Sequence, residues 1–179
     1  MRIPTRLQWA AYIGRSFVSR SIQLATRAGL EGPSHVAIRD SQTGAVYEAW
    51  EPNGVRVISH LGEGHAPGTR VDLFNWPLSD EDVSRVISFF LGEVGCKYDF
   101  RGIASFILKT PRDDPEKWFC SEINTAAGLL TANPVLVRCA PRSITPIASV
   151  RSPVLLYQSS VRTTKHGHQP LERNEPLYL

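Results

Sequence analysis

The chain has 179 residues, of which 42% are hydrophobic and 21% are charged, and its formal net charge is +3. This length and composition are ordinary for one globular domain with a sizeable core. The charge is mild, and the sequence has no dense basic stripe with interleaved aromatic residues, which argues against a nucleic-acid-binding protein. No apolar run approaches the length of a membrane span, which argues against a transmembrane protein.

The N-terminus and the cysteines bear on the compartment. The first eleven residues contain two arginines but no long apolar core and no small-residue cleavage site, so we expect no secretory signal and a cytoplasmic protein. Cys96, Cys120 and Cys139 are an odd number without paired spacing. They predict neither a disulfide framework nor a zinc site, and we expect no metal or other cofactor.

The first half of the chain is rich in short β-type segments separated by turn residues. The predicted strands are residues 9–13, 34–39, 45–50, 55–58 and 70–74. The second and third of these flank a polar turn and form the clearest hairpin in the sequence. A helix is predicted over residues 19–30, capped by Ser19 or Ser21 and ended by Gly29. Its predicted apolar stripe contains Ile22, Leu24, Ala25 and Ala28.

The middle of the chain reads as mainly helical. Ser79 and the three acidic residues after it form a capping signal for an amphipathic helix that runs to about Glu93. Its predicted apolar face contains Val83, Val86, Ile87, Phe90 and Leu91. Further helices are predicted over residues 100–108 and from Cys120 onwards.

The C-terminal part contains a last predicted strand at residues 154–157 and a polar tail from Ser159. We expect this tail, residues 159–179, to be an extended arm or disordered, which places the domain at residues 1–158. Helix, strands, helices and a final strand follow one another. That order predicts an α+β fold with an antiparallel sheet packed against a helical layer.

Cys120 lies at or just before the first turn of its predicted helix, whose apolar face contains Ile123, Ala126, Ala127 and Leu130. Backbone N–H groups are unpaired at a helix N-terminus, and the helix dipole favours an anion there. We therefore expect a lowered thiol pKa and a more nucleophilic sulfur, with N–H groups able to hold an oxyanion. The alternative is a buried, inert cysteine.

A nucleophilic cysteine also needs a general base within reach and a group that orients this base. Of the five histidines, only His35 starts a predicted strand, where a rigid element can aim it. His60 and His65 fall in or beside a Gly-rich loop, and His166 and His168 in the polar tail. The last two could bind a metal, but two ligands in a tail are weak evidence for a site.

Glu48 is the candidate for the orienting group, because it lies on the strand that pairs with the strand of His35. If the turn is centred between Ser41 and Gln42, His35 and Glu48 lie opposite each other and can form a hydrogen bond. If it is centred on Gln42, His35 faces Ala49 instead. A carboxylate at the second ring nitrogen would fix the tautomer and stabilise the imidazolium. The alternative for Glu48 is a surface charge on a strand edge.

Two further polar residues lie near these candidates. Tyr98 could point its hydroxyl at the oxyanion position; alternatively, Asp99 caps the following helix and Tyr98 packs in the core. Glu122 is expected to cap the cysteine helix or pair with an arginine, and we assign it no catalytic role.

Four segments in this order resemble the circularly permuted NlpC-like (YiiX/YebB-like) cysteine hydrolases of the papain-like superfamily. They are residues 34–38, 46–49, 95–100 and 119–122, and residues 143–146 resemble a later segment. The resemblance covers about residues 12–158. It implies a permuted papain-like fold with Cys120 as nucleophile at a helix N-terminus, His35 as base, Glu48 as orienting residue and Tyr98 near the oxyanion.

The resemblance also implies an activity. We expect a thiol hydrolase that cleaves an amide bond in cell-wall stem peptides through a thioester acyl-enzyme, with a peptide or peptidoglycan fragment as substrate. Many relatives carry a secretion signal; without one, an intracellular amidase or a phage-encoded, virion-associated or tail-associated wall hydrolase would fit. The alternatives are a lipid acyl hydrolase or acyltransferase, and a non-catalytic phage structural or wall-binding module. That module would use the surface of Trp9, Trp50, Trp76 and Trp118.

Overall fold

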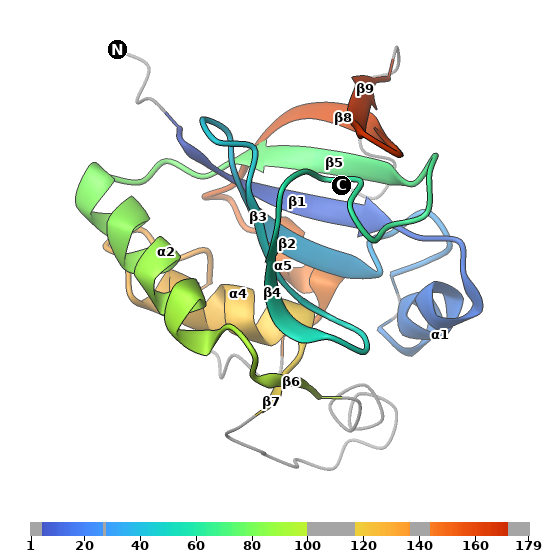
Figure 1. The fold of residues 1–179 in the computed structure, drawn as a ribbon, viewed down its shortest axis with the longest axis horizontal. Helices are drawn as coiled ribbons and strands as arrows, with labels where there is room; N and C mark the ends of the chain where they lie inside the picture. Colours follow the sequence, from blue (N-terminus) through green and yellow to red (C-terminus); the bar gives the residue numbers. More distant parts are fainter. Residues whose placement is uncertain (1–4, 27, 100–116, 137–143, 172–179) are drawn as a thin grey trace.

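The computed structural model describes residues 5–26, 28–99, 117–136 and 144–171, which form a mixed α+β fold (Figure 1). Seven antiparallel strands make one curled sheet in the order β4-β3-β2-β1-β5-β8-β9. The strands are β1 (Leu7–Ile13), β2 (His35–Asp40), β3 (Val46–Trp50), β4 (Gly54–Ile58), β5 (Arg70–Asn75), β8 (Leu156–Thr164) and β9 (Gly167–Pro170). A separate parallel pair consists of β6 (Lys97–Tyr98) and β7 (Lys117–Trp118).

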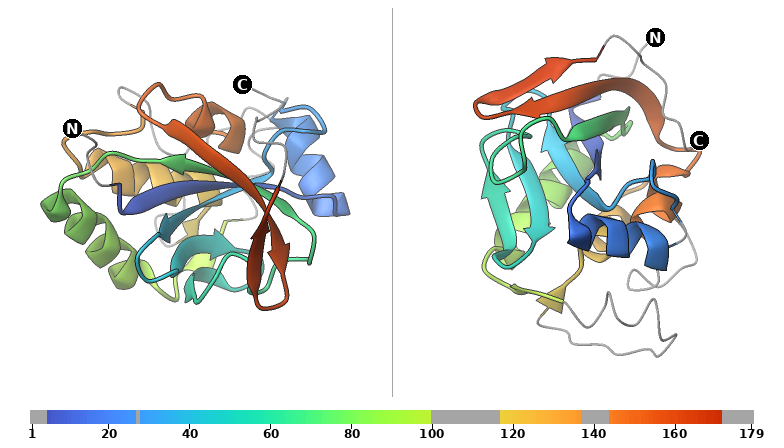
Figure 2. Two further views of the ribbon diagram at one scale, coloured as in Figure 1. Left: turned by 90° about the horizontal axis from the view of Figure 1, so that it is seen from above. Right: turned by 90° about the vertical axis from the view of Figure 1, so that its right-hand side faces the viewer.

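The helices are grouped mainly on one side of the sheet (Figures 1 and 2). They are α1 (Phe17–Ala25), α2 (Asp80–Glu93), α4 (Cys120–Leu129) and α5 (Pro146–Val150). Helix α4 packs against β2 and β3, and α2 and α5 contact α4. None of the helices in the described ranges has the length and apolarity needed to span a bilayer.

Alternation along the strands gives the sheet two apolar faces, because successive side chains point to opposite sides. The helix-covered face contributes Trp9, Val36 and Ala49 to the main core, together with side chains of α2, α4 and α5. The opposite, curled face carries a second core cluster that includes Ala37 and Leu73. The sheet is therefore buried on both sides near its centre, at β1 and β2.

Most of the predicted strands and the second helix are confirmed. Residues 9–13, 34–39, 45–50, 55–58 and 70–74 fall within or overlap β1 to β5. Helix α2 begins after Ser79, whose hydroxyl accepts a hydrogen bond from the backbone N–H of Asp82 at 3.1 Å. Leu91 was assigned to its apolar face wrongly, since it is 57% exposed and Asp82 is buried instead.

Helix α1 is shorter and starts earlier than expected. Ser16, rather than Ser19 or Ser21, is the N-cap, and the helix ends at Ala25, before Gly29. Leu24 is 81% exposed, so its place in the predicted apolar stripe is wrong. The buried face includes Gln23, whose side-chain amide donates to the carbonyl of Gly32 at 2.8 Å. A hydrogen-bonded polar residue therefore belongs to the buried face, at a position outside the predicted apolar stripe.

The expected polar arm from Ser159 is wrong for residues 159–171, and the domain does not end at residue 158. Strand β8 extends from Leu156 to Thr164, pairs with β5, and turns into β9 at the edge of the sheet (Figure 2). The buried side chains of this strand include Ser160 and Thr163, which satisfy their hydroxyls by hydrogen bonds to Asp72 and to the carbonyl of Ala66. The predicted helix at 100–108, Cys139 and residues 172–179 lie outside the described residues.

Two of the four tryptophans that a binding surface would use are in the core. Trp9 and Trp76 are fully buried and pack edge to face, with ring centroids 5.8 Å apart. Trp76 also donates its indole N–H to the carbonyl of Asn133 at 2.9 Å. The proposal of a four-tryptophan binding surface is therefore wrong for this pair.

Candidate active site

The β2–β3 hairpin brings His35 and Glu48 together, although its register is neither of the two considered. Ile38 pairs with Tyr47 and Arg39 with Val46, so the turn is centred between Gln42 and Thr43. Continuing this register places Glu48 opposite Ala37 and makes His35 and Glu48 diagonal neighbours on one face, within reach of long side chains. His35 Nε2 lies 2.8 Å from Glu48 Oε2.

Glu48 is fully buried, and its carboxylate contacts Arg56 and His65 as well as His35. Arg56 lies directly opposite it on β4 and donates to Oε1 from Nε at 2.9 Å and from Nη2 at 2.6 Å. Burial alone would raise the pKa of Glu48, but hydrogen bonds from His35 and His65 outweigh it and hold this pKa far below its usual range. The carboxylate is therefore ionised and can only accept hydrogen bonds.

His65 also belongs to this cluster, although the sequence pattern indicated only that it lies in or beside a Gly-rich loop. It lies in the loop between β4 and β5, its side chain is almost fully buried, and its Nε2 lies 3.1 Å from Glu48 Oε2. Its ring stacks on Tyr12 with centroids 4.2 Å apart. The loop reaches this position through the preceding glycine: Gly64 has a φ of +76°, and a Cβ there would stand 2.8 Å from Arg56 Nη2.

Cys120 is the first residue of α4, with Phe119 as its N-cap. The carboxylate of Glu122 accepts a hydrogen bond from the backbone N–H of Phe119 at 3.2 Å. Glu122 therefore caps the helix, which confirms one of its two expected roles. The expected lowering of the thiol pKa is wrong. Cys120 is fully buried, and burial raises its pKa to about 12, although backbone N–H groups of Val36 and Ser121 act in the opposite direction.

Cys120 and His35 approach the start of β2 from its two sides. Cys120 belongs to the helix-covered core with Val36, the residue whose N–H lies beside the sulfur. The neighbouring His35 side chain points to the curled face, on the same side as Ala37. The sulfur is thus held at the β2 backbone next to His35, but it does not line the cavity that His35 lines.

Tyr98 packs in the core, which is one of its two expected roles, and its expected role at the oxyanion stays a prediction. It is buried in β6, packs against Phe119 with ring centroids 6.0 Å apart, and lines the same cavity as His35. Burial, and then the negative charges that Cys120 and Glu51 can carry, raise the pKa of Tyr98 well above its usual value. Its hydroxyl therefore stays protonated and is a potential hydrogen-bond donor.

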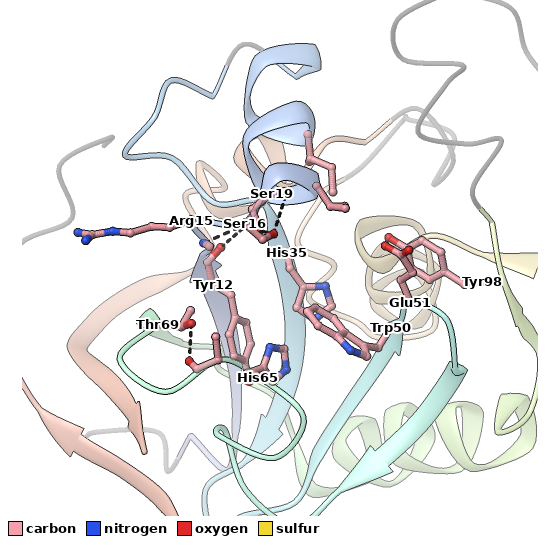
Figure 3. A pocket seen from close by; sticks show the side chains of 15 residues that line it. Tyr12, Arg15, Ser16, Ser19, His35, Trp50, Glu51, His65, Thr69 and Tyr98 are labelled. Carbon is pink, nitrogen blue, oxygen red and sulfur yellow. Dashed lines mark hydrogen bonds between the residues drawn. The ribbon is translucent and has the colours of Figure 1, made fainter. Parts of the chain in front are cut away.

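A cavity of about 230 Å³ lies between α1, the start of β2 and the loop that carries His65. Figure 3 shows the rings of Tyr12, His65, Trp50 and His35 gathered together, with Glu51 and Tyr98 beside one another. Burial lowers the pKa of His35 more than Glu48 raises it, so the ring is neutral at neutral pH. The cavity is therefore walled by aromatic rings, with an uncharged base at its side.

The cluster is also the place where a metal ion could be held. The ligand atoms of His35, Glu48 and His65 all lie within 4.8 Å of one another, and no other group of three such residues occurs in the described ranges. His166 and His168, the pair noted in the sequence, lie in the β8–β9 hairpin at the turn and on the edge strand.

Comparison of the chain with protein-family models gives no match, and comparison with curated proteins gives none either. The family resemblance seen in the sequence therefore remains a prediction.

Proposed function

We propose that the protein is a cysteine hydrolase in which Cys120 is the nucleophile, His35 the general base and Glu48 the residue that orients the base. The observation that carries this proposal is the 2.8 Å contact between His35 Nε2 and Glu48 Oε2. Because an ionised carboxylate only accepts hydrogen bonds, His35 must carry its proton on Nε2. The basic lone pair is then on Nδ1, where it can accept the proton of a thiol.

The raised pKa of Cys120 and the lowered pKa of His35 indicate how the reaction would begin. Burial favours the neutral thiol of Cys120 and the neutral ring of His35. We infer that the resting enzyme holds no thiolate–imidazolium pair, and that His35 Nδ1 removes the thiol proton as the sulfur attacks the carbonyl. The imidazolium formed in this step is stabilised by Glu48, which is already in place.

In the remaining steps the proton on His35 passes to the leaving amine, and the amine and the carboxylic acid are released in turn. The backbone N–H of Cys120, with the hydroxyl of Tyr98, would hold the oxyanion of the tetrahedral intermediate. His35 returns its proton to the leaving nitrogen, which leaves a thioester on Cys120. A water molecule, deprotonated by His35, then attacks the thioester carbonyl and regenerates the thiol. Because the sulfur does not line the cavity, this path requires the Cys120 side chain to turn toward the cavity side of β2.

The substrate class follows the resemblance and is limited by the cavity. An amide bond in a cell-wall stem peptide is the substrate that the resemblance favours. A volume of about 230 Å³ accommodates one side chain or a short acyl group. Val18, Ile22, Tyr12 and Trp50 make much of the wall apolar, which favours an acyl ester as the alternative substrate of the same chemistry.

The test is digestion of purified peptidoglycan fragments and of a short-chain acyl ester, with the products identified by mass spectrometry. We expect cleavage by the unaltered protein, none by Cys120→Ala or His35→Gln, and unchanged cleavage by Cys96→Ala. Intact-mass measurement during turnover should show one acyl group on Cys120. Cleavage that survives in Cys120→Ala would contradict the proposal.

A non-catalytic binding module is the second candidate, and one observation favours it. Cys120 is fully buried, burial raises its pKa to about 12, and it does not line the cavity. If the unaltered protein cleaves none of the substrates but binds wall fragments, and Cys120→Ala binds them equally well, this candidate replaces the hydrolase.

A further inference from the structure

We propose that His35, Glu48 and His65 form a binding site for one divalent transition-metal ion of the zinc type. We assign the ligand atoms as His35 Nε2, Glu48 Oε2 and His65 Nε2, the atoms that already contact one another. The two nitrogens lie 2.8 and 3.1 Å from the shared oxygen. Ligands of a tetrahedral zinc ion are about 3.4 Å apart, since zinc–nitrogen and zinc–oxygen bonds are about 2.1 Å long. Outward shifts of a few tenths of an ångström would therefore admit the ion.

The three side chains are held in place by their surroundings, so little order has to be created when a metal binds. Glu48 and His35 belong to paired strands, and His65 stacks on Tyr12 at 4.2 Å and contacts the tilted ring of Trp50 at 4.3 Å, measured between ring centroids. The ring of His35 meets Trp50 edge to face at 4.9 Å. Preorganised ligands of this kind favour metal binding because their rotamers are already fixed.

The cavity beside the cluster supplies the open coordination position that a three-ligand zinc site requires. His35 and His65 both line it, so a water molecule or a carbonyl oxygen can reach an ion held between them (Figure 3). Both rings must exchange tautomers when the ion binds. Each now donates Nε2–H to Glu48, and in the metal complex each Nε2 lone pair binds the ion while the proton moves to Nδ1.

Arg56 sets the strength of the site. Its guanidinium occupies Glu48 Oε1 and leaves Oε2 to the ion, but its positive charge is next to the metal position and is only partly exposed. Like charges at this distance repel each other strongly in a buried site. We therefore expect Arg56→Gln to bind zinc at least about tenfold more tightly than the unaltered protein. A purely structural role of Arg56 would predict weaker binding.

The consequence for activity rests on the proposed function. Zinc at Nε2 forces the proton of His35 onto Nδ1, the nitrogen that has to accept the thiol proton. Zinc would therefore inhibit the hydrolase, and a chelator would restore it.

The test is calorimetric titration of the metal-free protein with ZnCl2, which does not depend on turnover. We expect one ion per chain in the unaltered protein and in Cys120→Ser, and binding weakened at least tenfold in His65→Gln and in Glu48→Gln. The exposed His168→Gln is the matched control and should bind as before. If binding is absent, or is unchanged in His65→Gln, the site does not exist.

If the variants fail to fold, the site can still be tested on the unaltered protein. Co2+ can then replace zinc, because its visible spectrum reports the ligand type. Four-coordinate bands without a sulfur-to-cobalt charge-transfer band support the site, and a strong charge-transfer band would show thiolate ligation and overturn it. If the protein binds zinc but shows no hydrolysis after a chelator has removed the metal, the metal site stands and only the proposed function is removed.

Discussion

Substitution of Glu48 by Gln tests whether the buried charge cluster is the structural centre of the site. The change removes the negative charge and turns one oxygen into an NH2 group, while four N–H donors of His35, His65 and Arg56 still point at the side chain. The side chain of Arg56 is 21% exposed, so its guanidinium regains only part of its hydration. Removing one partner of a buried ion pair costs about 3–5 kcal/mol, and the partial exposure of Arg56 favours the lower end, about 3 kcal/mol.

Urea denaturation followed by circular dichroism measures this loss. With a slope of about 2 kcal/mol per molar urea, the midpoint should fall by about 1.5 M. Glu81→Gln is the matched control, because Glu81 also pairs with an arginine, Arg85, but is mostly exposed. Exposed pairs contribute about 0–1 kcal/mol, so its midpoint should barely move. Equal losses in the two variants would refute the view of Glu48 as a buried ionic centre.

Three further predictions concern other parts of the chain. Burial raises the pKa of Asp40, but hydrogen bonds from Arg6, Gln42 and Thr43 and the charge of Arg6 together outweigh it, so this pKa is lowered in the folded state. The contribution of Asp40 to stability is therefore present above its unfolded pKa of 3.8 and is lost as the pH falls through the lower folded value. The unaltered protein should therefore have a higher urea midpoint than Asp40→Asn at pH 6, and this difference should shrink as the pH is lowered below 4. A difference that stays constant with pH contradicts this. Iodoacetamide at pH 7 should modify the half-buried Cys96 before the fully buried Cys120, as peptide mapping would show, and faster labelling of Cys120 would mean that its sulfur is accessible. Ser79→Ala should lower the free energy of unfolding by about 1 kcal/mol through loss of the α2 cap, and an unchanged urea midpoint would refute this role.

Elements set by local patterns could be predicted from the sequence. The hairpin strands, β4, β5 and α2 follow from alternation, from turn residues and from the Ser79 cap, all of which act within a few residues. The contact between His35 and Glu48 was predicted from a register one residue away from the observed turn centre. It survives because shifting the turn centre by a full residue keeps both side chains on the same face.

Residues whose role depends on tertiary contacts were harder to find. His65 reaches Glu48 only because the β4–β5 loop folds back over the sheet, which no local pattern encodes. Arg56 carried a usable signal, since a turn centred on Pro52 places it directly opposite Glu48. In β8, hydrogen-bonded Ser160 and Thr163 replace apolar residues in the core, so hydrophobic periodicity could not detect the strand.

The position of the proton on His35 connects the hydrolase and the metal site. In the metal-free protein Glu48 is ionised and accepts from both rings, so both histidines carry their proton on Nε2. Nitrogen chemical shifts of the rings report this tautomer directly, and zinc should reverse it at both residues together. If His35 carried its proton on Nδ1 without metal, it could not accept a thiol proton there. It could not then donate to Glu48 either, and the proposed hydrolase would lose the geometry on which it depends, whereas Nε2 would already be free to bind a metal ion.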